Sequence, residues 1–270
     1  MISVIIPTYN RRRLLERTLA GVLAQTEKDY EVIVADDGST DDTFEYLQSQ
    51  CVLAIHLSHS GKPAIARNSG IAYAQGEFVA FLDSDDAWET TALEELAAAL
   101  ASAPDAGFAF GDYAPAPARP QAAQHGPDGG VAIDIFESLL MTDFLATGSL
   151  LIRREAIETV GEFDARLWVA DDWDYWLRLA AQFKAVHVSK PLVHIHAVPD
   201  GISRASGGTI FADNKLISQK MAAWCLTHRP AAWPLARRVR RRSLYESARY
   251  QWHHGRYAQM ARDLITLLGP

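Results

Sequence analysis

The chain has 270 residues, of which 49% are hydrophobic and 22% are charged, with a formal net charge of −7. This composition is ordinary for a globular enzyme, and no run of about 18 apolar residues could span a bilayer. Its two cysteines show neither metal-binding spacing nor a disulfide framework, and no signal pattern precedes the first apolar segment, so we expect a cytoplasmic location.

Short apolar segments alternate with amphipathic ones over the first hundred residues. The pattern predicts strands near 2–6, 31–35, 52–57 and 78–82, and helices over 11–25, 41–50, 63–74 and 89–101. Alternation of this kind is typical of βαβ units, so we expect an α/β fold with a mostly parallel sheet.

The remainder of the chain is less regular until its last quarter. A segment rich in Pro and Gly, 114–130, predicts a loop or insertion, and 131–160 predicts two helices with a strand near 149–152 between them. A further strand is expected within 186–195. After residue 205 the pattern is helical, with Gly255 between the last two helices. We therefore expect a domain over 1–205, with halves 1–110 and 111–205, and a helical extension over 206–270.

Polar loops follow three of the predicted strands, at 7–10, 36–39 and 83–86. Ligands of open α/β sheets bind at the edge where the strands have their carboxyl ends. The last loop, Asp83-Ser84-Asp85-Asp86, holds three carboxylates, which repel one another unless a cation or hydrogen-bond donors lie among them. Mg²⁺ prefers such oxygens and often shares them with phosphates. The loops predict a site for a metal-bound nucleoside diphosphate; the alternative is an acidic turn that caps a helix beginning near Trp88.

Charge is distributed unevenly along the chain. Residues 1–205 hold 15 Lys and Arg against 30 Asp and Glu, a balance of −15, whereas 206–270 hold 11 against 3, a balance of +8. The basic excess peaks at 237–242. A solvated helix face, docking on the acidic body, and attraction to an anionic membrane surface are all compatible with this run. Nucleic acid is not expected, because the body is acidic and no nucleic-acid motif is present.

Eight short motifs in a fixed order make the chain resemble the family 2 inverting glycosyltransferases, which have a GT-A fold. They lie at 4–10, 36–40, 66–70, 76–77, 83–86, 148–149, 160–164 and 170–178. The resemblance covers roughly 1–205 and leaves the basic tail outside. It implies a Rossmann-like nucleotide-binding half, an acceptor-side half that carries the catalytic base, and a helical C-terminal tail.

On the donor side, the resemblance implies that one set of residues contacts the nucleotide sugar: Pro7, Thr8, Tyr9, Asp37, Arg67, Asp83 and Ser84. It also implies that Asp85, with Asp83 and His196, holds Mn²⁺ or Mg²⁺, although His194 is a second candidate histidine. Simpler explanations stay open for several of these side chains. Asp37 could belong to a turn, Arg67 could form a salt bridge on a helix surface, and the histidines could lack any ligand role.

On the acceptor side, the resemblance makes Asp172 the catalytic base, because it occupies the second position of an acidic pair. The first position is Asp171, where the family has Glu. Gly148, Asp171 and Trp173 are then expected near the acceptor. A helix N-terminus with favourable acids would also explain the pair, and core packing would explain Trp173. Asp174 and Arg178 lie one helical turn apart and predict a structural ion pair.

The expected function is inverting transfer of a sugar from a nucleotide-diphosphate sugar to an acceptor hydroxyl, by metal-assisted single displacement. The resemblance further implies a carbohydrate or lipid-linked acceptor in surface polysaccharide or glycolipid synthesis. The basic tail adds the expectation of peripheral contact with the inner face of the membrane. The alternatives are a metal-dependent nucleotidyltransferase and a non-catalytic nucleotide-sugar-binding protein. A nucleotidyltransferase would need a Gly-rich basic loop near its N-terminus, which this chain lacks. A binding protein would have no need of a base.

Overall fold

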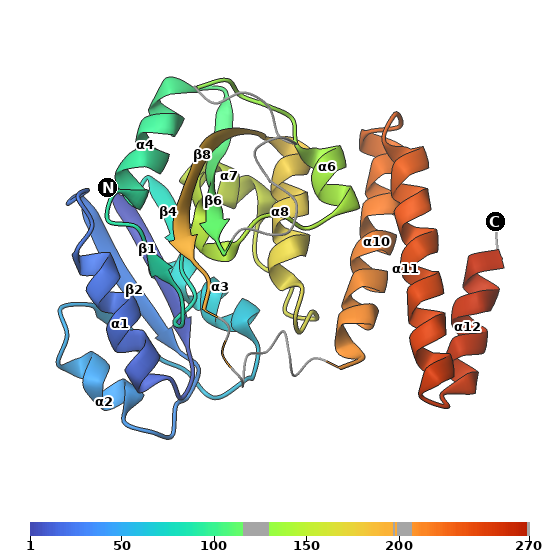
Figure 1. Cartoon of the computed structure of the whole chain (residues 1–270), viewed down its shortest axis with the longest axis horizontal. Helices are drawn as coiled ribbons and strands as arrows, with labels where there is room; N and C mark the ends of the chain where they lie inside the picture. Colours follow the sequence, from blue (N-terminus) through green and yellow to red (C-terminus); the bar gives the residue numbers. More distant parts are fainter. Residues whose placement is uncertain (116–129, 197, 199–206, 269–270) are drawn as a thin grey trace.

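The protein consists of an α/β body and a layer of three long helices beside it (Figure 1). A computed structural model describes residues 1–115, 130–196, 198 and 207–268. The predicted Pro- and Gly-rich segment lies mostly outside these residues. No helix within them is long and apolar enough to cross a membrane.

One eight-stranded sheet runs through the body in the order β3-β2-β1-β4-β7-β6-β8-β5. Strands β1 to β4 are parallel, as predicted, with Ile5 of β1 opposite Ile33 of β2 and Phe81 of β4. Strand β7 is antiparallel to both its neighbours, while β6 and β8 are parallel to each other. The strands are β1 (Ile2–Thr8), β2 (Tyr30–Asp36), β3 (Leu53–His56), β4 (Phe78–Phe81), β5 (Ala87–Trp88), β6 (Ala106–Ala114), β7 (Leu150–Arg153) and β8 (Lys184–His194).

The predicted helices of the first hundred residues are all present, with ends that move by up to three residues. The helices of the body are α1 (Arg12–Leu23), α2 (Thr43–Gln48), α3 (Pro63–Tyr73), α4 (Ala92–Ser102), α6 (Phe136–Met141), α7 (Arg154–Val160) and α8 (Asp171–Gln182), with a 3₁₀ turn η1 (Thr147–Ser149). The helix expected to begin near Trp88 begins at Ala92, because Ala87–Trp88 forms β5 and pairs with β8. The alternative of an acidic turn at 83–86 that caps this helix is therefore wrong, since the N-cap residue is Thr91.

Helices cover both faces of the sheet, and each face has its own apolar core. Successive side chains of a strand point to opposite faces. Ile5 of β1 accordingly lies in the core under α3 and α8, whereas Val4 and Ile6 lie in the core under α1 and α4. Helix α3 approaches β1 closely at Gly70, where a Cβ would lie 2.3 Å from Cγ2 of Ile5. This close packing holds the elements whose ends form the site.

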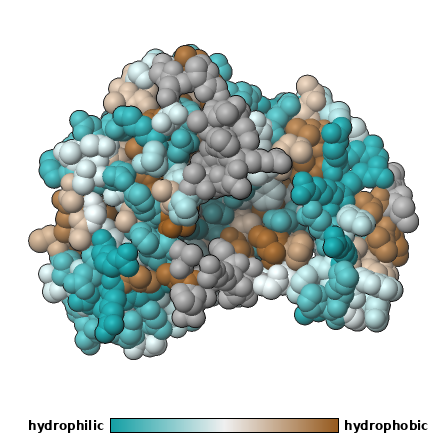
Figure 2. All heavy atoms as spheres, viewed as in Figure 1, coloured by the Kyte–Doolittle hydropathy of each residue, from teal (hydrophilic) through white to brown (hydrophobic). Residues whose placement is uncertain are grey.

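The C-terminal extension consists of α10 (Thr209–His228), α11 (Trp233–His253) and α12 (Tyr257–Leu268), and α10 lies nearest the body (Figure 1). Ile217 and Met221 of α10 belong to the same buried cluster as Trp176 of α8. In Figure 2, hydrophobic residues gather where the body meets these helices, while their outer surface is largely hydrophilic. Gly255 separates the last two helices, as predicted.

A buried carboxylate joins the three C-terminal helices. Asp263 of α12 is 2% exposed and accepts hydrogen bonds from Nζ of Lys215 on α10, at 2.8 Å, and from Oγ of Ser247 on α11, at 2.6 Å. Removing either donor would leave a buried charge incompletely satisfied, which is costly. The extension is thus a specifically packed three-helix unit.

Candidate active site

The three polar loops lie side by side at the carboxyl edge of the parallel strands. Their main chains are joined directly: the N–H of Asp37 donates to O of Thr8 at 2.9 Å, and the N–H of Leu82 donates to O of Ile5 at 3.0 Å. Oδ1 of Asn10 accepts the N–H of Thr40 at 2.7 Å. The strand register therefore brings residues 7–10, 36–40 and 83–86 to one edge.

Asp37 and Tyr9 lie at the edge formed by β1 and β2. The carboxylate of Asp37 is 5% exposed and accepts the N–H of Ser60 at 2.9 Å and the N–H of Gly61 at 2.8 Å. Its neighbour Tyr9 is 37% exposed, and its ring stacks on His59 with centroids 4.0 Å apart. Asp37 thus fixes the loop that supplies His59, the aromatic partner of the exposed Tyr9 ring.

Arg67 joins the two halves of the body. This guanidinium from α3 is almost fully buried; Nη1 contacts Oδ2 of Asp171 at 2.6 Å, and Nη2 contacts Oδ1 of Asp83 at 2.9 Å. Asp83 follows β4, whereas Asp171 begins α8. One side chain therefore holds the acidic loop after β4 beside the acidic pair at the start of α8. The helix-surface salt bridge considered for Arg67 is wrong, because the guanidinium is buried and both of its carboxylate partners lie inside the site.

Asp85 pairs with a residue that the sequence argument did not single out. Nη1 of Arg11, just before α1, lies 2.5 Å from Oδ2 of Asp85. Burial raises the pKa of Asp85, and the Arg11 charge opposes that rise. Asp86 accepts the main-chain N–H of His196 at 3.0 Å, and burial followed by the charge of Asp83 raises its pKa to about 8. Arg11 directly follows the 7–10 loop, and this position was the only feature of the sequence that could have indicated its role in the site.

The side chains around Asp85 have the chemistry of a site for a hard divalent cation. Asp83 and Asp85 supply oxygens, and the buried Nδ1 of His196 has no hydrogen-bond partner among the described residues. His194 is placed differently, because its Nε2 lies 2.5 Å from Oε1 of Glu89. Within the described part of the chain, no cluster of three or more His, Cys, Asp or Glu is already arranged around a common point. These oxygen and nitrogen atoms suit Mn²⁺ or Mg²⁺ as ligands. In this structure Arg11 holds one of the ligands, the Asp85 carboxylate, in an ion pair.

Asp172 lies in the first turn of α8 and is half-buried. Burial, followed by the charge of Asp171, raises its pKa to about 7, while Arg67 opposes the rise. Oδ1 accepts the N–H of Trp173 at 2.7 Å, and Oγ1 of Thr147 lies 3.4 Å from Oδ2. A carboxylate whose pKa is near neutrality is suited to accept a proton from a hydroxyl. Asp143 also lies near enough that the charge of Asp172, after burial, raises its pKa; no motif marked Asp143 in the sequence.

The other residues expected on the acceptor side have structural contacts. O of Gly148 accepts Nε1–H of Trp88 at 2.6 Å, and Nε1–H of Trp173 donates to O of Leu139 at 3.0 Å. Trp173 packs against the body's core beside α6, in agreement with its alternative interpretation. Gly148 lies where a Cβ would come within 2.9 Å of Leu82, at the end of β4. Gly148 therefore permits the close approach of η1 to the acidic loop.

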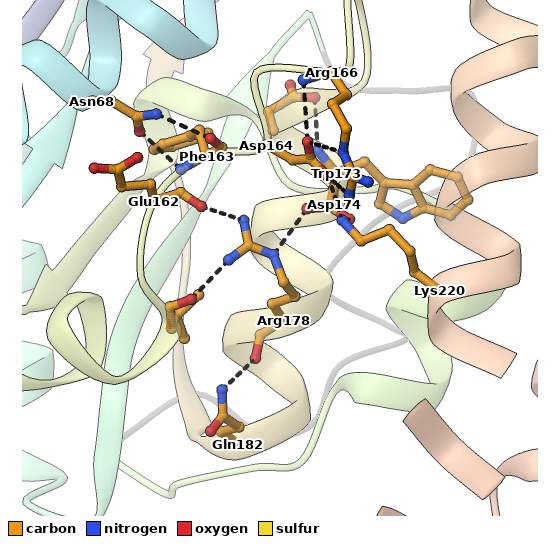
Figure 3. Close-up of polar contacts among 12 residues, drawn as sticks. Asn68, Glu162, Phe163, Asp164, Arg166, Trp173, Asp174, Arg178, Gln182 and Lys220 are labelled. Carbon is orange, nitrogen blue, oxygen red and sulfur yellow. Dashed lines mark hydrogen bonds and ion pairs between the residues drawn. The ribbon is translucent and has the colours of Figure 1, made fainter. Parts of the chain in front are cut away.

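The predicted ion pair of Asp174 and Arg178 is confirmed and belongs to a larger network. Nε of Arg178 lies 2.9 Å from Oδ2 of Asp174, and Nζ of Lys220 on α10 lies 2.5 Å from Oδ1 (Figure 3). Lys220 also contacts Asp164 at 2.8 Å, and Arg166 pairs with the same carboxylate. The network connects α8 and the loop before it to the C-terminal extension.

This fold and this edge define a glycosyltransferase of the GT-A type. The family model described as "Glycosyl transferase family 2" matches residues 3–161, and the chain belongs to that family. An uncharacterized glycosyltransferase of a Nostoc species is 33% identical over 76% of this chain and 68% of its own length. TuaG of Bacillus subtilis, a putative teichuronic acid biosynthesis glycosyltransferase, is 41% identical over 35% of this chain and 40% of its own.

Solved structures show the same fold. TarS of S. aureus, residues 1–349 with UDP-GlcNAc, superimposes with a TM-score of 0.69 at 18% identity, covering 98% of this chain and 90% of that one. The mannosyltransferase PcManGT of Pyrobaculum calidifontis, with GDP-Man and Mn²⁺, gives a TM-score of 0.67 at 21% identity, covering 100% of this chain and 76% of that one.

A further sequence relative has a named activity. The WfaP enzyme of Escherichia coli is 38% identical over 34% of this chain and 38% of its own length; its name describes a UDP-Glc:α-D-GlcNAc-diphosphoundecaprenol β-1,3-glucosyltransferase.

Proposed function

We propose that this glycosyltransferase transfers a sugar, with inversion, from a nucleotide-diphosphate sugar to a hydroxyl of a lipid-linked polysaccharide precursor. The observation that carries the proposal is the position of Arg67 between Asp83 and Asp171. Arg67 holds the Asp83 loop beside Asp171, the residue before Asp172, and this supports a site in which a donor phosphate and an acceptor hydroxyl meet. The printed activity of WfaP supports the lipid-linked acceptor.

On the donor side, the roles we propose follow from the loop geometry. Pro7, Thr8 and Tyr9 line the nucleoside position, with Asp37 holding the 59–61 loop against it. Ser84 and Asp83 lie beside the sugar and ribose, and Arg67 restrains Asp83. Asp83, Asp85 and His196 would hold Mn²⁺ or Mg²⁺, which when bound neutralises charge on the departing diphosphate. Arg11, which pairs with Asp85 here, would then face phosphate oxygens.

On the acceptor side, Asp172 is the proposed general base. It removes the proton of the acceptor hydroxyl as that oxygen attacks the anomeric carbon and the bond to the diphosphate breaks. Asp171 does not act as a base, because its carboxylate is engaged by Arg67. Its negative charge and the surrounding burial keep the pKa of Asp172 high enough for proton transfer near pH 7.

The experiment that tests this assignment is Asp172→Asn, which keeps the shape and removes the base. Turnover should fall by about 10²-fold or more, whereas binding of the nucleoside diphosphate should persist. UDP-Glc, UDP-GlcNAc and GDP-Man with Mn²⁺ are the donors to screen, with calorimetry for binding. Asp174→Asn, on the same helix but outside the site, is the matched control. Near-normal transfer by Asp172→Asn would move the base to another residue.

We also propose that residues 1–205 form the catalytic domain and that 206–270 form an extension contacting an anionic membrane surface. Exposed residues of α11 recur at intervals of three and four and define one basic face: Pro234, Arg237, Arg238, Arg241, Arg242, Tyr245, Arg249 and Trp252. Arg240 lies outside it. Because these side chains are exposed in the folded chain, this face is not docked on the acidic body. Arginines interleaved with exposed aromatic rings suit an interfacial helix.

Cosedimentation with vesicles containing anionic lipid tests the contact. Each arginine near such a surface contributes about 1 kcal/mol, so changing Arg238, Arg241 and Arg249 to Gln should weaken binding at low salt by about 10²-fold. Changing Arg13, Arg17 and Lys184 removes the same charge from the exposed surface of the body and should have little effect. Equal sedimentation of both triple variants would refute a specific basic face.

A further inference from the structure

We propose that Asp213 of α10 is a positioning residue for the catalytic base; the inference rests on the proposed role of Asp172. Asp213 lies 52 residues beyond the end of the family match and is 4% exposed. Its carboxylate is directed at the loop that leads into α8. The C-terminal extension thereby reaches the element that presents the base.

Three consecutive main-chain N–H groups converge on one oxygen of Asp213. Oδ2 accepts the N–H of Trp168 at 2.9 Å, of Val169 at 2.8 Å and, less closely, of Ala170 at 3.3 Å. Hydrogen bonds to a charged acceptor are about twice as strong as neutral ones. Three of them on successive residues fix both the path and the orientation of this stretch of backbone.

This stretch ends where α8 begins. Ala170 is the N-cap residue of α8, and it has no side chain that could cap the helix. Its position normally belongs to Ser, Thr, Asp or Asn, whose oxygen holds the first turn. Here a carboxylate from another helix holds the three residues up to and including the N-cap. Asp171 and Asp172 follow immediately, so the direction in which their side chains leave the helix depends on this anchor.

A second set of contacts restrains the same loop. Nζ of Lys62, just before α3, donates to O of Ala165 at 2.5 Å and lies 4.6 Å from the centre of the Trp168 ring. Lys62 connects the loop to the helix that carries Arg67. The loop is therefore held between α3 and α10, and Asp213 supplies the anchor nearest to the base.

The test compares Asp213→Ala with Lys220→Met in the full chain. Lys220 also joins α10 to α8 but contacts only side chains, at Asp164 and Asp174. In Asp213→Ala, the amides of 168–170 should exchange about tenfold faster or more, while amides within α10 keep their protection. Small displacements of a catalytic group can cost up to about 10²-fold, so we expect kcat to fall about tenfold or more with KM for the nucleotide sugar unchanged.

Two further results decide between positioning and plain stabilisation. Asp213→Asn keeps an acceptor oxygen in place and should recover most of the lost kcat, whereas Lys220→Met should lower Tm without lowering kcat. If kcat falls equally in Asp213→Ala and Lys220→Met, or the 168–170 amides stay protected, Asp213 is not a positioning residue. A wild type that transfers no sugar would refute the proposed function instead. In that case carboxyl NMR of Asp172 tests the positioning role without turnover. If Asp213 positions Asp172, the pKa of Asp172 moves in Asp213→Ala and not in Lys220→Met.

Discussion

Replacing Asp171 by Asn should shift the acid limb of the pH–rate profile to lower pH. The pKa of Asp172 is raised to about 7, first by burial and then by the charge of Asp171, while Arg67 lowers it. Asparagine removes the second cause and still offers an oxygen to Nη1 of Arg67. With its pair partner neutral, the guanidinium stabilises the Asp172 carboxylate more effectively, so both effects lower the pKa.

The expected size follows from the charges involved. A single nearby charge moves a carboxyl pKa by about 1–3 units, and the partial compensation of Asp171 by Arg67 places the change at the lower end, about 1 unit. With a pKa of about 7, roughly a tenth of the base is ionised at pH 6; with a pKa of about 6, roughly a half is ionised. The value of kcat/KM at pH 6, relative to its plateau, should therefore rise about fivefold.

The assay is a pH profile of kcat/KM, which reports groups of the free enzyme. Asp174→Asn is the matched control, because Asp174 lies on the same helix but pairs with Arg178 and Lys220. It should lower Tm and leave the acid limb in place. An acid limb that does not move in Asp171→Asn, or that moves to higher pH, would refute the electrostatic account of this site.

Two further predictions concern the metal and the interface with the extension. Asp85→Asn should abolish the Mn²⁺-dependent gain in nucleoside diphosphate affinity. Arg11→Gln frees Asp85 of its partner and should increase Mn²⁺ affinity. Calorimetry that shows no change in either variant would contradict the assignment of Asp85 as a metal ligand. Lys220→Met should lower the free energy of unfolding by about 1–3 kcal/mol, against less than about 1 kcal/mol for Lys190→Met at an exposed pair with Glu95. The ion pairs with Arg166 and Lys220 hold the pKa of Asp164 below its usual range. This stabilisation should therefore be present at neutral pH and lost as pH falls below about 4. Equal losses of unfolding free energy in Lys220→Met and Lys190→Met would show that the interface contributes little.

The parallel half of the sheet could be predicted because each of its strands is a short apolar run bounded by polar loops. The same pattern failed at β5 and β6. Ala87–Trp88 is only two residues long and owes its strand conformation to pairing with β8, a contact that no local pattern encodes. Strand β6 (Ala106–Ala114) is apolar but lies beside a Pro- and Gly-rich segment, and its partners β7 and β8 come much later in the chain.

The site shows the same division between local and distant information. Family motifs mark Asp83, Asp85 and Asp172 because each lies in a short sequence motif at the end of a helix or strand. Arg11 and Asp213 act through pairings across 74 and 43–45 residues of sequence, respectively, so only the folded chain reveals them. Roles that depend on bound sugar, nucleotide or metal stay predictions for the motif residues too.

Two of the three acidic-loop carboxylates, Asp83 and Asp85, pair with arginines, and this has a consequence for how fast the donor arrives. An uncompensated cluster of Asp83 and Asp85 would repel a nucleotide sugar, which carries two negative phosphates. Arg67 and Arg11 offset that field before any ligand is present. Charge at a binding cleft alters association rates and their dependence on ionic strength. The association rate of the nucleotide sugar should therefore vary little with salt in the wild type, and Arg11→Gln should make association slower at low ionic strength than at high.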